Sequence, residues 1–340
     1  MTVKDLARLS GYSLGTVSRV LNNQPNVSEQ ARRKIMSIVE ESGFELNANA
    51  KNLKQQRSTS LLVIVKGRAN ELFAMLVEQI QSLIRETEHP LLLAYIDEED
   101  NEVRQAAQLC REKKPMGVLF LGGDNTHFLE DFKEINVPAV LVTNSAAGLP
   151  FQNLASVTTD DTDAARCAMQ FLLDQGHREI LVIGGYGSSE VSRMRLDGCV
   201  KAVARASCGY QYQPARFSFA QGYEAMDRQL KGGQRVTAVF ALADVMAIGA
   251  MRCIRDHGLR VPEDISVIGF DGLPLGQYYS PKLSTISQPV EALAKECVEL
   301  LLDMIDGGKP RHVTVPYTLS VNESVKNIES EASSCAAAAF

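Results

Sequence analysis

From residue 60 onward, the chain alternates short apolar runs with longer segments whose apolar residues recur at helical spacing. This alternation predicts parallel sheets that carry helices on both faces. About ten strands over roughly 270 residues suit two sheets better than one, because most sheets contain ~4–6 strands. Doubly wound sheets bind ligands at the carboxyl ends of their strands, so a cleft between two lobes is the expected binding site. The clearest predicted strands cover residues 61–65, 91–95, 117–121, 139–142, 180–183, 238–241 and 266–270.

The first 45 residues follow a different pattern, with apolar positions spaced as in three short helices. Thr2 can cap the first helix, with Asp5 in a capping-box arrangement, and Ser13 and Ser28 can cap the second and third. Two helices joined by a short glycine-containing turn, with a third that completes a small core, form a helix-turn-helix unit. The apolar positions at helical spacing are Val3, Leu6, Ala7, Leu9, Val17, Val20, Leu21, Ala31, Ile35, Ile38 and Val39.

Residues 46–59, which read LNANAKNLKQQRST, form a polar segment between these two parts. A segment this polar cannot bury enough apolar surface to fold alone. Its run 47–54 could become helical, although isolated helices of this length are marginal. We therefore expect a hinge linker whose structure depends on what it contacts.

Charge is divided unevenly along the chain. The net charge is −6, whereas residues 1–60 contain nine Lys or Arg and five Asp or Glu, so this part carries +4 and the remainder −10. A basic head on an acidic body is expected of a small polyanion-binding module attached to a larger carrier. The division therefore favours a nucleic-acid partner that the overall charge would have argued against.

No stretch of the sequence approaches the roughly 18–20 apolar residues that cross a bilayer, and the N-terminus lacks the apolar core of a signal peptide. We therefore expect a cytoplasmic protein without a membrane partner. The seven cysteines occur singly, without a CxxC pair, and the five histidines are dispersed. In a reducing compartment such cysteines are expected to be small buried hydrophobes. The sequence predicts no metal site and no cofactor.

Several runs of the chain match one family of proteins in order. The head contains VKDLARLSGYS, TVSRVLNN, VSEQAR and NANAKNL, and the remainder contains LLDQGHREILVIGG, MRLDGCVKA, AVFALADVMAIGAM, LRVPEDISVIGFDG and PKLSTISQP. The chain thus resembles the LacI/GalR (lactose-repressor/galactose-repressor) family over nearly its whole length. The resemblance implies a transcriptional repressor that binds double-stranded operator DNA, with an operator affinity that changes allosterically when a small carbohydrate-like molecule binds.

The resemblance also implies an α/β fold class with a small all-α helix-turn-helix head, a hinge helix and two doubly wound α/β lobes like those of periplasmic binding proteins. The head covers residues 1–45, the hinge 46–59 and the effector-binding and dimerisation core 60–330. The expected segments are about 60–157 and 287–316 for lobe 1, about 158–286 and 317–330 for lobe 2, and 331–340 for a frayed tail.

A recognition helix lies in the major groove with its N-terminal side chains against base edges. Arg19 can contact guanine O6 and N7, or a phosphate, whereas Leu14 offers only apolar contact and Gly15 has no side chain. The resemblance implies that Leu53 is a wedge in the minor groove, with Lys51 beside it. The alternatives are a solvated Arg19 and a Leu53 that packs against the core. The expected DNA-binding residues are Ser13, Leu14, Gly15, Thr16, Ser18, Arg19, Asn22, Lys51 and Leu53.

The resemblance maps effector contacts onto the core. Arg195 matches an arginine that grips the ligand, Asp271 matches an acid at the cleft, and Phe73 and Phe217 match aromatic walls. A structural salt bridge is the alternative role of Arg195, and a helix N-cap is that of Asp244. The expected effector-binding residues are Lys66, Arg68, Phe73, Thr143, Arg195, Phe217, Asp244 and Asp271.

Departures from the family pattern change the expected ligand. Ala243 stands where many relatives have asparagine and Thr143 near where many have aspartate, so two acceptors for a neutral sugar are missing. Lys66 and Arg68 follow the first strand, and with Arg195 they would place three positive charges near one site. Because such side chains form charge-assisted hydrogen bonds with phosphate and carboxylate, we expect a sugar phosphate or sugar acid. The alternative is a neutral sugar, with the side chains at positions 66 and 68 facing solvent.

An enzyme and a solute-binding or chemosensory module are the competing classes. The GxxxxGK[ST] phosphate loop and the GxGxxG fingerprint are both absent, so we expect no enzyme. The basic head and the missing signal peptide disfavour a chemosensory module.

Two recognition helices that read a palindrome need a two-fold axis, so we expect a homodimer. The C-terminal residues contain no leucine heptad for a tetrameric bundle.

Overall fold

The computed structural model describes residues 2–21, 27–42, 59–68, 70–185, 189–206 and 208–328. It divides the chain into two compact units, Met1–Ser58 and Thr59–Phe340. The predicted hinge helix, the predicted frayed tail and the candidate DNA contacts Asn22, Lys51 and Leu53 lie outside the described residues.

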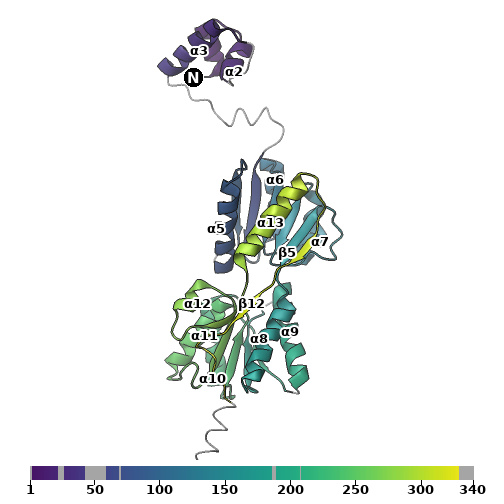
Figure 1. Cartoon of the computed structure of the whole chain (residues 1–340), viewed down its shortest axis with the longest axis vertical. Coiled ribbons are helices and arrows are strands. Elements are labelled where there is room, and N and C mark those ends of the chain that lie inside the picture. Colours follow the sequence, from purple (N-terminus) through teal and green to yellow (C-terminus); the bar gives the residue numbers. More distant parts are fainter. Residues whose placement is uncertain are drawn as a thin grey trace, which may run out of the picture. The chain divides into compact units, whose positions relative to one another are not determined.

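The smaller unit contains the three predicted helices, α1 (Val3–Ser10), α2 (Leu14–Leu21) and α3 (Glu29–Ser42) (Figure 1). The predicted capping box at the start of α1 is present: the Thr2 N–H donates to the Asp5 carboxylate at 2.9 Å, and the Asp5 N–H donates to Thr2 Oγ1 at 3.3 Å. Ser13 and Ser28 accept equivalent bonds at the starts of α2 and α3. The small core that these helices share is formed by Leu6, Val17, Val20 and Ile35.

The larger unit contains two six-stranded sheets. In the first, all neighbouring strands are parallel and their order is β11-β5-β4-β3-β1-β2. We call this sheet with its helices lobe 1. Its strands are β1 (Leu61–Lys66), β2 (Leu91–Ile96), β3 (Gly117–Leu121), β4 (Ala139–Val142), β5 (Leu154–Thr158) and β11 (His312–Thr314).

The second sheet, with its helices, is lobe 2, and its strand order is β12-β10-β9-β8-β6-β7. Strand β12 runs antiparallel to β10, while the other pairs are parallel. The seven clearest predicted strands are all present, each within one residue of its predicted bounds. The strands of lobe 2 are β6 (Ile180–Ile183), β7 (Gln211–Gln213), β8 (Ala238–Ala241), β9 (Ser266–Asp271), β10 (Ser284–Ser287) and β12 (Thr318–Ser320).

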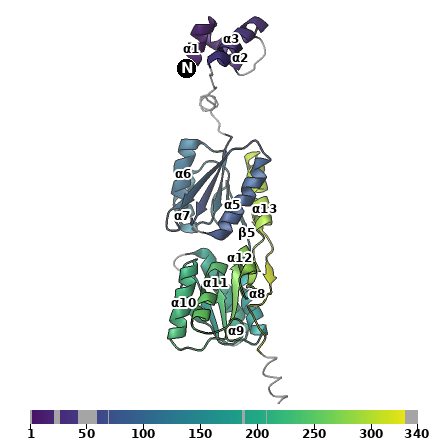
Figure 2. The same ribbon diagram turned by 90° about the vertical axis from the view of Figure 1, so that its left-hand side faces the viewer.

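Helices cover both faces of the sheets (Figures 1 and 2). In β1, Leu61, Val63 and Val65 join the core cluster that includes α5 and α13, whereas Leu62 and Ile64 join the cluster beneath α6 and α7. Because successive strand residues point to opposite faces, a strand covered on both sides needs apolar residues at every position. The helices are α5 (Glu71–Arg85), α6 (Glu102–Lys113), α7 (Asn125–Asp131), η1 (Phe132–Glu134), α8 (Asp161–Asp174), α9 (Glu190–Ala206), α10 (Phe219–Lys231), α11 (Asp244–Asp256), α12 (Pro274–Tyr278) and α13 (Val290–Ile305).

The chain passes between the lobes from β5 into α8, from β10 into α13 and from β11 into β12. Helix α8 packs against β8 and β10 of lobe 2, whereas α13 packs against β3, β4 and β5 of lobe 1. The first two passages leave the carboxyl ends of β5 and β10, so these ends of the two sheets are joined by short segments. Among the described residues, no helix combines the length and apolar character that crossing a membrane requires.

Candidate functional site

The start of α2 presents an accessible face. Val17 and Val20 point into the core of the head and turn the other side of the helix outward. Leu14 is 49% exposed, so a large apolar side chain meets solvent at the N-terminal end of this helix. Four of the predicted DNA contacts on this segment are exposed, namely Ser13, Leu14, Gly15 and Arg19. Thr16 and Ser18 are partly buried.

Residues 11–15 also match the G-x-S-x-G pattern of serine hydrolases. In those enzymes the serine sits on a sharp turn between a strand and a helix. Here Ser13 lies between two helices, where its Oγ accepts the Thr16 N–H at 3.2 Å and pairs with Thr16 Oγ1 at 2.9 Å. Ser13 is therefore a helix cap in this structure, and the pattern match indicates no catalytic nucleophile.

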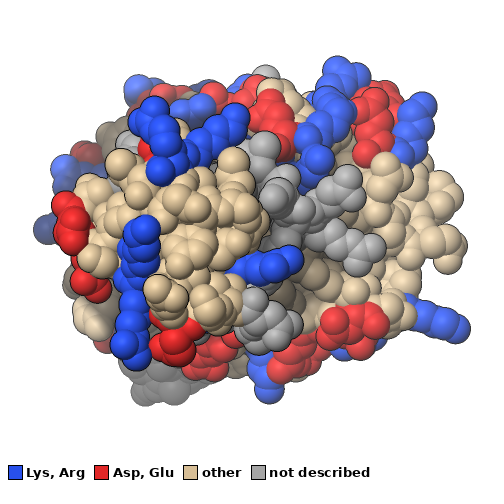
Figure 3. All heavy atoms as spheres, turned by 90° about the horizontal axis from the view of Figure 1, so that it is seen from above, with Lys and Arg blue, Asp and Glu red and all other residues tan. Residues whose placement is uncertain are grey.

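Basic side chains are exposed on the head. Lys4, Arg8, Arg33 and Lys34 are exposed as well as Arg19. Figure 3 shows Lys and Arg side chains in several groups on one view of the surface, with Asp and Glu between them. Exposed Lys and Arg side chains can contact phosphates, and such contacts carry no sequence information.

Arg195 is held at the carboxyl end of the second sheet and is only 5% exposed. Its Nε donates to Asp161 Oδ1 at 2.7 Å, and its Nη1 donates to the Leu242 carbonyl at 2.6 Å and lies 3.6 Å from Asp271 Oδ1. The guanidinium carbon lies 3.6 Å from the centre of the Phe270 ring. Burial raises the pKa of Asp161, and Arg195 opposes that shift. The predicted structural salt bridge of Arg195 is therefore present, in a geometry that also fixes the guanidinium at the expected ligand site.

Two strand ends have an unusual backbone conformation. Asp271, the last residue of β9, has φ 120°, and Thr143, which follows β4, has φ 73°. Non-glycine residues in this region store strain and cluster at functional sites. Asp271 Oδ1 accepts from Gln288 Nε2 at 2.8 Å, and the Gln288 side-chain oxygen Oε1 accepts from the Thr159 hydroxyl at 3.4 Å. Burial raises the pKa of Asp271 to about 6, while Arg195 and Gln288 oppose the shift.

The three predicted cations do not form a free positive pocket. Lys66 Nζ lies 2.5 Å from the carboxylate of Glu102, a residue with no exposed surface. Arg68 Nε lies 2.8 Å from Asp97 Oδ1, and these side chains are 65% and 64% exposed. Since Arg195 also has an acidic partner, each of the three cations expected near one site is paired with an acid, which disfavours the expected anionic ligand. Basic residues are visible in a sequence, whereas the acids that pair with them can lie far away along the chain and become neighbours only in the folded protein.

Glu102 organises the end of the first sheet. Its Oε1 accepts the Asp124 N–H at 2.7 Å, and its Oε2 contacts Lys66 and, at 2.9 Å, His127 Nδ1. The carboxylate thereby orders the segment between β3 and α7, where a doubly wound sheet meets its ligand. The sequence offers no motif that would have marked this residue.

Protein groups bind both carboxylate oxygens of Asp244. It is fully buried, its Oδ2 accepts the Leu273 N–H at 2.7 Å, and its Oδ1 accepts the Thr285 hydroxyl at 2.6 Å. The N-cap of α11 is Ala243, so the predicted N-cap role of Asp244 is wrong. Burial raises the pKa of Asp244 well above its ordinary value. Because protein groups occupy both oxygens, the geometry favours a structural role over an effector contact.

The two predicted aromatic walls lie in different surroundings. Phe73 is 7% exposed, and its ring packs so closely on Gly122 that a Cβ there would lie 2.9 Å from it. Phe217 is half-buried against the core beside Arg216, whose Nη1 lies 2.5 Å from Glu99 Oε1. Since Glu99 follows β2 and Arg216 follows β7, this ion pair connects lobe 1 to lobe 2.

Three buried polar atoms in the described residues lack a hydrogen-bond partner: Asn125 Oδ1, Glu190 Oε2 and Ser192 Oγ. Asn125 begins α7 in lobe 1, and the other two lie in the first turn of α9 in lobe 2. Burial raises the pKa of Glu190, Arg193 opposes the shift, and Asp124 and Asp161 add to it, so charges from both lobes act on one carboxyl group. An unpaired buried polar group costs about 1–3 kcal/mol, which a ligand could recover. These three residues were not predicted from the sequence, because no motif contains them.

Two family models match the chain. "Bacterial regulatory proteins, lacI family" matches residues 2–47, and "Periplasmic binding protein-like domain" matches residues 169–325. Among curated proteins, the HTH-type transcriptional regulator MalR of Clostridium butyricum is 34% identical, with 96% of this chain and 100% of the relative covered.

Solved structures also match over nearly the whole chain. The crystal structure of the Lac repressor dimer bound to operator and the anti-inducer ONPF has a TM-score of 0.81 and 26% identity, and the match covers 96% of this chain and 99% of that one. The complex of the transcriptional regulator CelR with cellobiose has a TM-score of 0.69 and 28% identity, with 95% and 99% covered.

Proposed function

Because this chain belongs to the lacI family of bacterial regulatory proteins, we propose that it is a sequence-specific transcriptional repressor whose operator affinity changes when a small carbohydrate-like molecule binds between its lobes. One observation carries the proposal. A helix-turn-helix head with an accessible α2 face shares a chain with two doubly wound lobes whose strand ends gather strained backbone and unpaired buried polar atoms.

In the proposed DNA complex, α2 lies in the major groove and Arg19 reaches a base edge or a phosphate. The exposure of its N-terminal residues supports this placement. By resemblance to the family, Leu53 enters the minor groove and Lys51 contacts DNA beside it. The proposed set of contacts is Ser13, Leu14, Gly15, Thr16, Ser18, Arg19, Asn22, Lys51 and Leu53.

We propose that the effector is a neutral carbohydrate. Arg195 and the carboxylate of Asp271 are two of the polar contacts predicted from the sequence, and Asn125, Glu190 and Ser192 add unpaired polar atoms. Sugar hydroxyls can donate to carboxylate and amide oxygens, whereas a phosphate group carries a charge of about −1.5 to −2 at pH 7 and would be repelled by the acids. The cellobiose bound to the similar CelR supports this class. Phe73, Phe217 and Thr143 remain proposed wall residues.

The experiment that tests this function starts with selection of duplexes from a random library by the full-length chain. Binding of the enriched duplex is then measured by fluorescence anisotropy against neutral mono- and disaccharides and their phosphate and acid forms. We expect one enriched, salt-sensitive duplex and at least one neutral sugar that shifts its Kd. Failure to enrich any duplex would contradict the repressor assignment, and a shift by anionic sugars alone would contradict the neutral effector.

Effector affinity is expected to fall below pH 6. A sugar hydroxyl that donates to Asp271 needs the ionised carboxylate, whose pKa is raised to about 6 by burial. Binding is therefore favoured above that pH and weakened as the pH falls through it, by about tenfold between pH 7.5 and pH 5 for a single linked proton. Calorimetric titration measures this pH dependence for the wild type and Asp271→Asn, with the sugar that the anisotropy measurements identify as the effector. The variant should bind weakly at every pH, and an unchanged pH profile in the variant would exclude Asp271 as the linked group.

We propose that the chain forms a homodimer through lobe 2. A groove of about 550 Å³ is lined by residues of α10 and α11 and by Tyr279. Phe219 at this groove is 39% exposed, and the similar Lac repressor is a dimer on its operator. The residues that line the groove are Phe219, Ala220, Tyr223, Glu224, Ile248, Gly249, Arg252 and Tyr279.

Phe219→Glu is expected to weaken the dimer at least about tenfold, because a charge buried at the centre of an interface is poorly compensated. Sedimentation equilibrium measures the dissociation constant. Leu129→Glu is the matched control, since Leu129 is 58% exposed on α7 of lobe 1, outside the groove. Equal dissociation constants for the two variants would place the interface elsewhere.

The proposal extends to three broader points. We infer that the chain catalyses no reaction, since its family is regulatory, and that it acts in the cytoplasm, where bacterial DNA lies. We also propose the boundaries expected from the sequence, with a head over 1–45, a hinge over 46–59 and a two-lobed core over 60–330. The positions at which the chain passes between the sheets support the lobe boundaries.

A further inference from the structure

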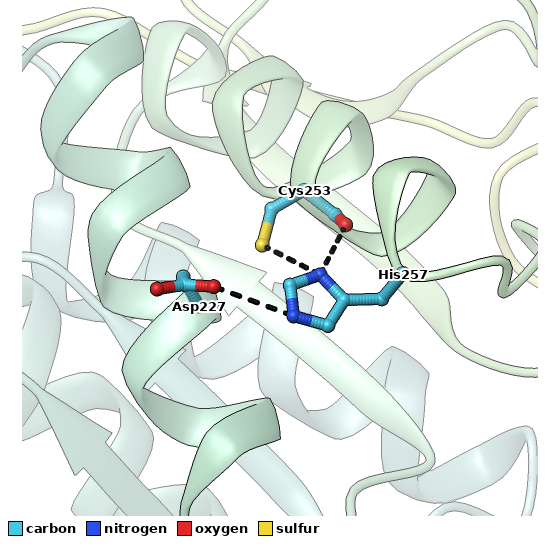
Figure 4. Close-up of side chains that lie close together, drawn as sticks. All are labelled: Asp227, Cys253 and His257. Carbon is cyan, nitrogen blue, oxygen red and sulfur yellow. Dashed lines mark hydrogen bonds and ion pairs between the residues drawn. The ribbon is translucent and has the colours of Figure 1, made fainter.

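Asp227, Cys253 and His257 gather between α10 and the C-terminal end of α11 (Figure 4). Cys253 and His257 are four residues apart, so they lie on one face of the helix end. Cys253 Sγ lies 3.7 Å from His257 Nδ1, and His257 Nε2 lies 3.3 Å from Asp227 Oδ1 on α10. One donor atom from each of the three residues lies within 4.8 Å of the others.

These distances suit one tetrahedral metal ion. Zn²⁺ binds thiolate sulfur at ~2.3 Å and imidazole nitrogen at ~2.0–2.1 Å, which separates two such ligand atoms by about 3.6 Å. The Cys253 sulfur and His257 Nδ1 have nearly this separation, and zinc would replace the hydrogen bond that this nitrogen makes at 3.0 Å with the Cys253 carbonyl oxygen. Asp227 contacts the other ring nitrogen of His257, Nε2. A rotation of the Asp227 side chain or of the His257 imidazole would therefore let the Asp227 carboxylate bind the same ion as Cys253 and His257. Thiolate, imidazole and carboxylate together favour zinc over magnesium or calcium.

The two helices hold these side chains on a rigid frame. A Cβ on Gly249 of α11 would lie 2.1 Å from the carbonyl oxygen of Phe219 on α10, so the backbones are in close contact. Ligands on packed helices keep their spacing better than ligands on loops. Helix α11 begins next to the effector region and ends before His257, so the cluster lies about 20 Å away at ~1.5 Å per residue.

The surroundings of the thiol favour a cation. Two carboxylates, those of Asp227 and Asp256, lie near the Cys253 thiol, and Arg252 pairs with Asp256 at 3.0 Å. A divalent ion would bind the thiolate, release its proton and balance these acids. The competing cation is Lys231, whose Nζ lies 2.7 Å from Asp227 Oδ2.

We propose that Asp227, Cys253 and His257 form a zinc site that ties α10 to α11 in lobe 2, with water in the fourth position. The site is separate from the proposed effector region and revises the expectation of no metal. This zinc site was not predicted from the sequence, because Asp227 lies on a different helix and only Cys253 and His257 are close along the chain.

The test uses the full-length, tag-free chain after removal of metals with a chelator. Zn²⁺ is titrated in competition with a chromophoric chelator, and Co²⁺ is added in a separate experiment. We expect one Zn²⁺ per chain with a submicromolar Kd, a thiolate-to-cobalt charge-transfer band and a higher Tm with zinc. Cys253→Ser, His257→Gln and Asp227→Asn should each weaken zinc binding at least about tenfold.

Cys208→Ser is the control, because Cys208 is a partly buried cysteine of lobe 2 outside the cluster, and its zinc affinity should equal that of the wild type. Circular dichroism checks that each variant folds. If Cys253→Ser does not fold, His257→Gln decides, since the His257 side chain is 30% exposed. A cobalt spectrum without a thiolate band, a Kd weaker than micromolar, or wild-type affinity in the folded variants would each overturn the proposal.

Discussion

Arg195→Ala is expected to abolish the response to effector and to destabilise the larger unit by about 3–5 kcal/mol. Arg195 is the shared partner of Asp161 and Asp271, whose carboxyl groups are 4% and 12% exposed. Without the guanidinium, both carboxylates lose their ion pair in a buried site, and the Leu242 carbonyl loses a donor. Loss of the guanidinium raises the pKa of both acids further, so the folded variant keeps them protonated at low pH and loses stability as the pH rises.

Urea unfolding at pH 5 and pH 8 measures the stability of this variant, and operator anisotropy with effector measures its response. Lys201→Ala is the matched control, since Lys201 lies on the same helix in a pair with Asp197 that is more than half exposed. Arg195→Lys separates the two roles, because lysine keeps the charge but cannot contact Asp161, Leu242 and a ligand with a planar fork. A stable Arg195→Ala variant with a wild-type effector response would refute both roles.

Arg19→Ala is expected to weaken binding to the selected operator by about 1–3 kcal/mol, or roughly 5- to 150-fold. Arg19 is exposed on α2, on the side opposite the buried Val17 and Val20. An arginine at this position can pair with guanine in two hydrogen bonds, and its loss leaves one base pair unread. The preference at one operator position should therefore relax.

Anisotropy titrations against operators substituted one base pair at a time measure this change. Arg33→Ala removes the same charge from α3, where Arg33 is 82% exposed and pairs with Glu29 at 3.7 Å. This control should affect all duplexes alike, because a phosphate contact carries no sequence information. Equal losses on operator and random DNA for Arg19→Ala would show that Arg19 contacts only the backbone.

Local pattern was enough to predict the three helices of the head and seven of the twelve strands in the described residues. The strands at 61–65 and 117–121 are apolar at every position because helices cover both faces of their sheet, and that requirement is visible in the residues themselves. The capping box of Thr2 and Asp5 joins residues three apart, so it too is a property of a short segment. The direction of β12 was not predictable, because it depends on which edge strand receives it.

The site depended on contacts between distant segments. The sequence identified Arg195 and Asp271 through motifs, but not Asp161, which pairs with Arg195 from another helix. In the sequence, Lys66 and Arg68 favoured an anionic ligand. In the folded protein Glu102 and Asp97 pair with them, so these two positive charges no longer favour that ligand. An ion pair between helices and loops has no fixed spacing along the chain, so its partners cannot be read from composition.

The sequence by itself determined the helical head, the two doubly wound lobes and the positions of Arg19 and Arg195, because each follows from periodicity or from a contiguous motif. Only the tertiary structure decided that Asp244 is buried beneath Leu273 and Thr285, and that Asp227 faces Cys253. The physical reason is the same in both cases. Burial and the approach of side chains from separate helices set the charge and ligand chemistry of a carboxylate, and neither quantity is encoded in its neighbours along the chain.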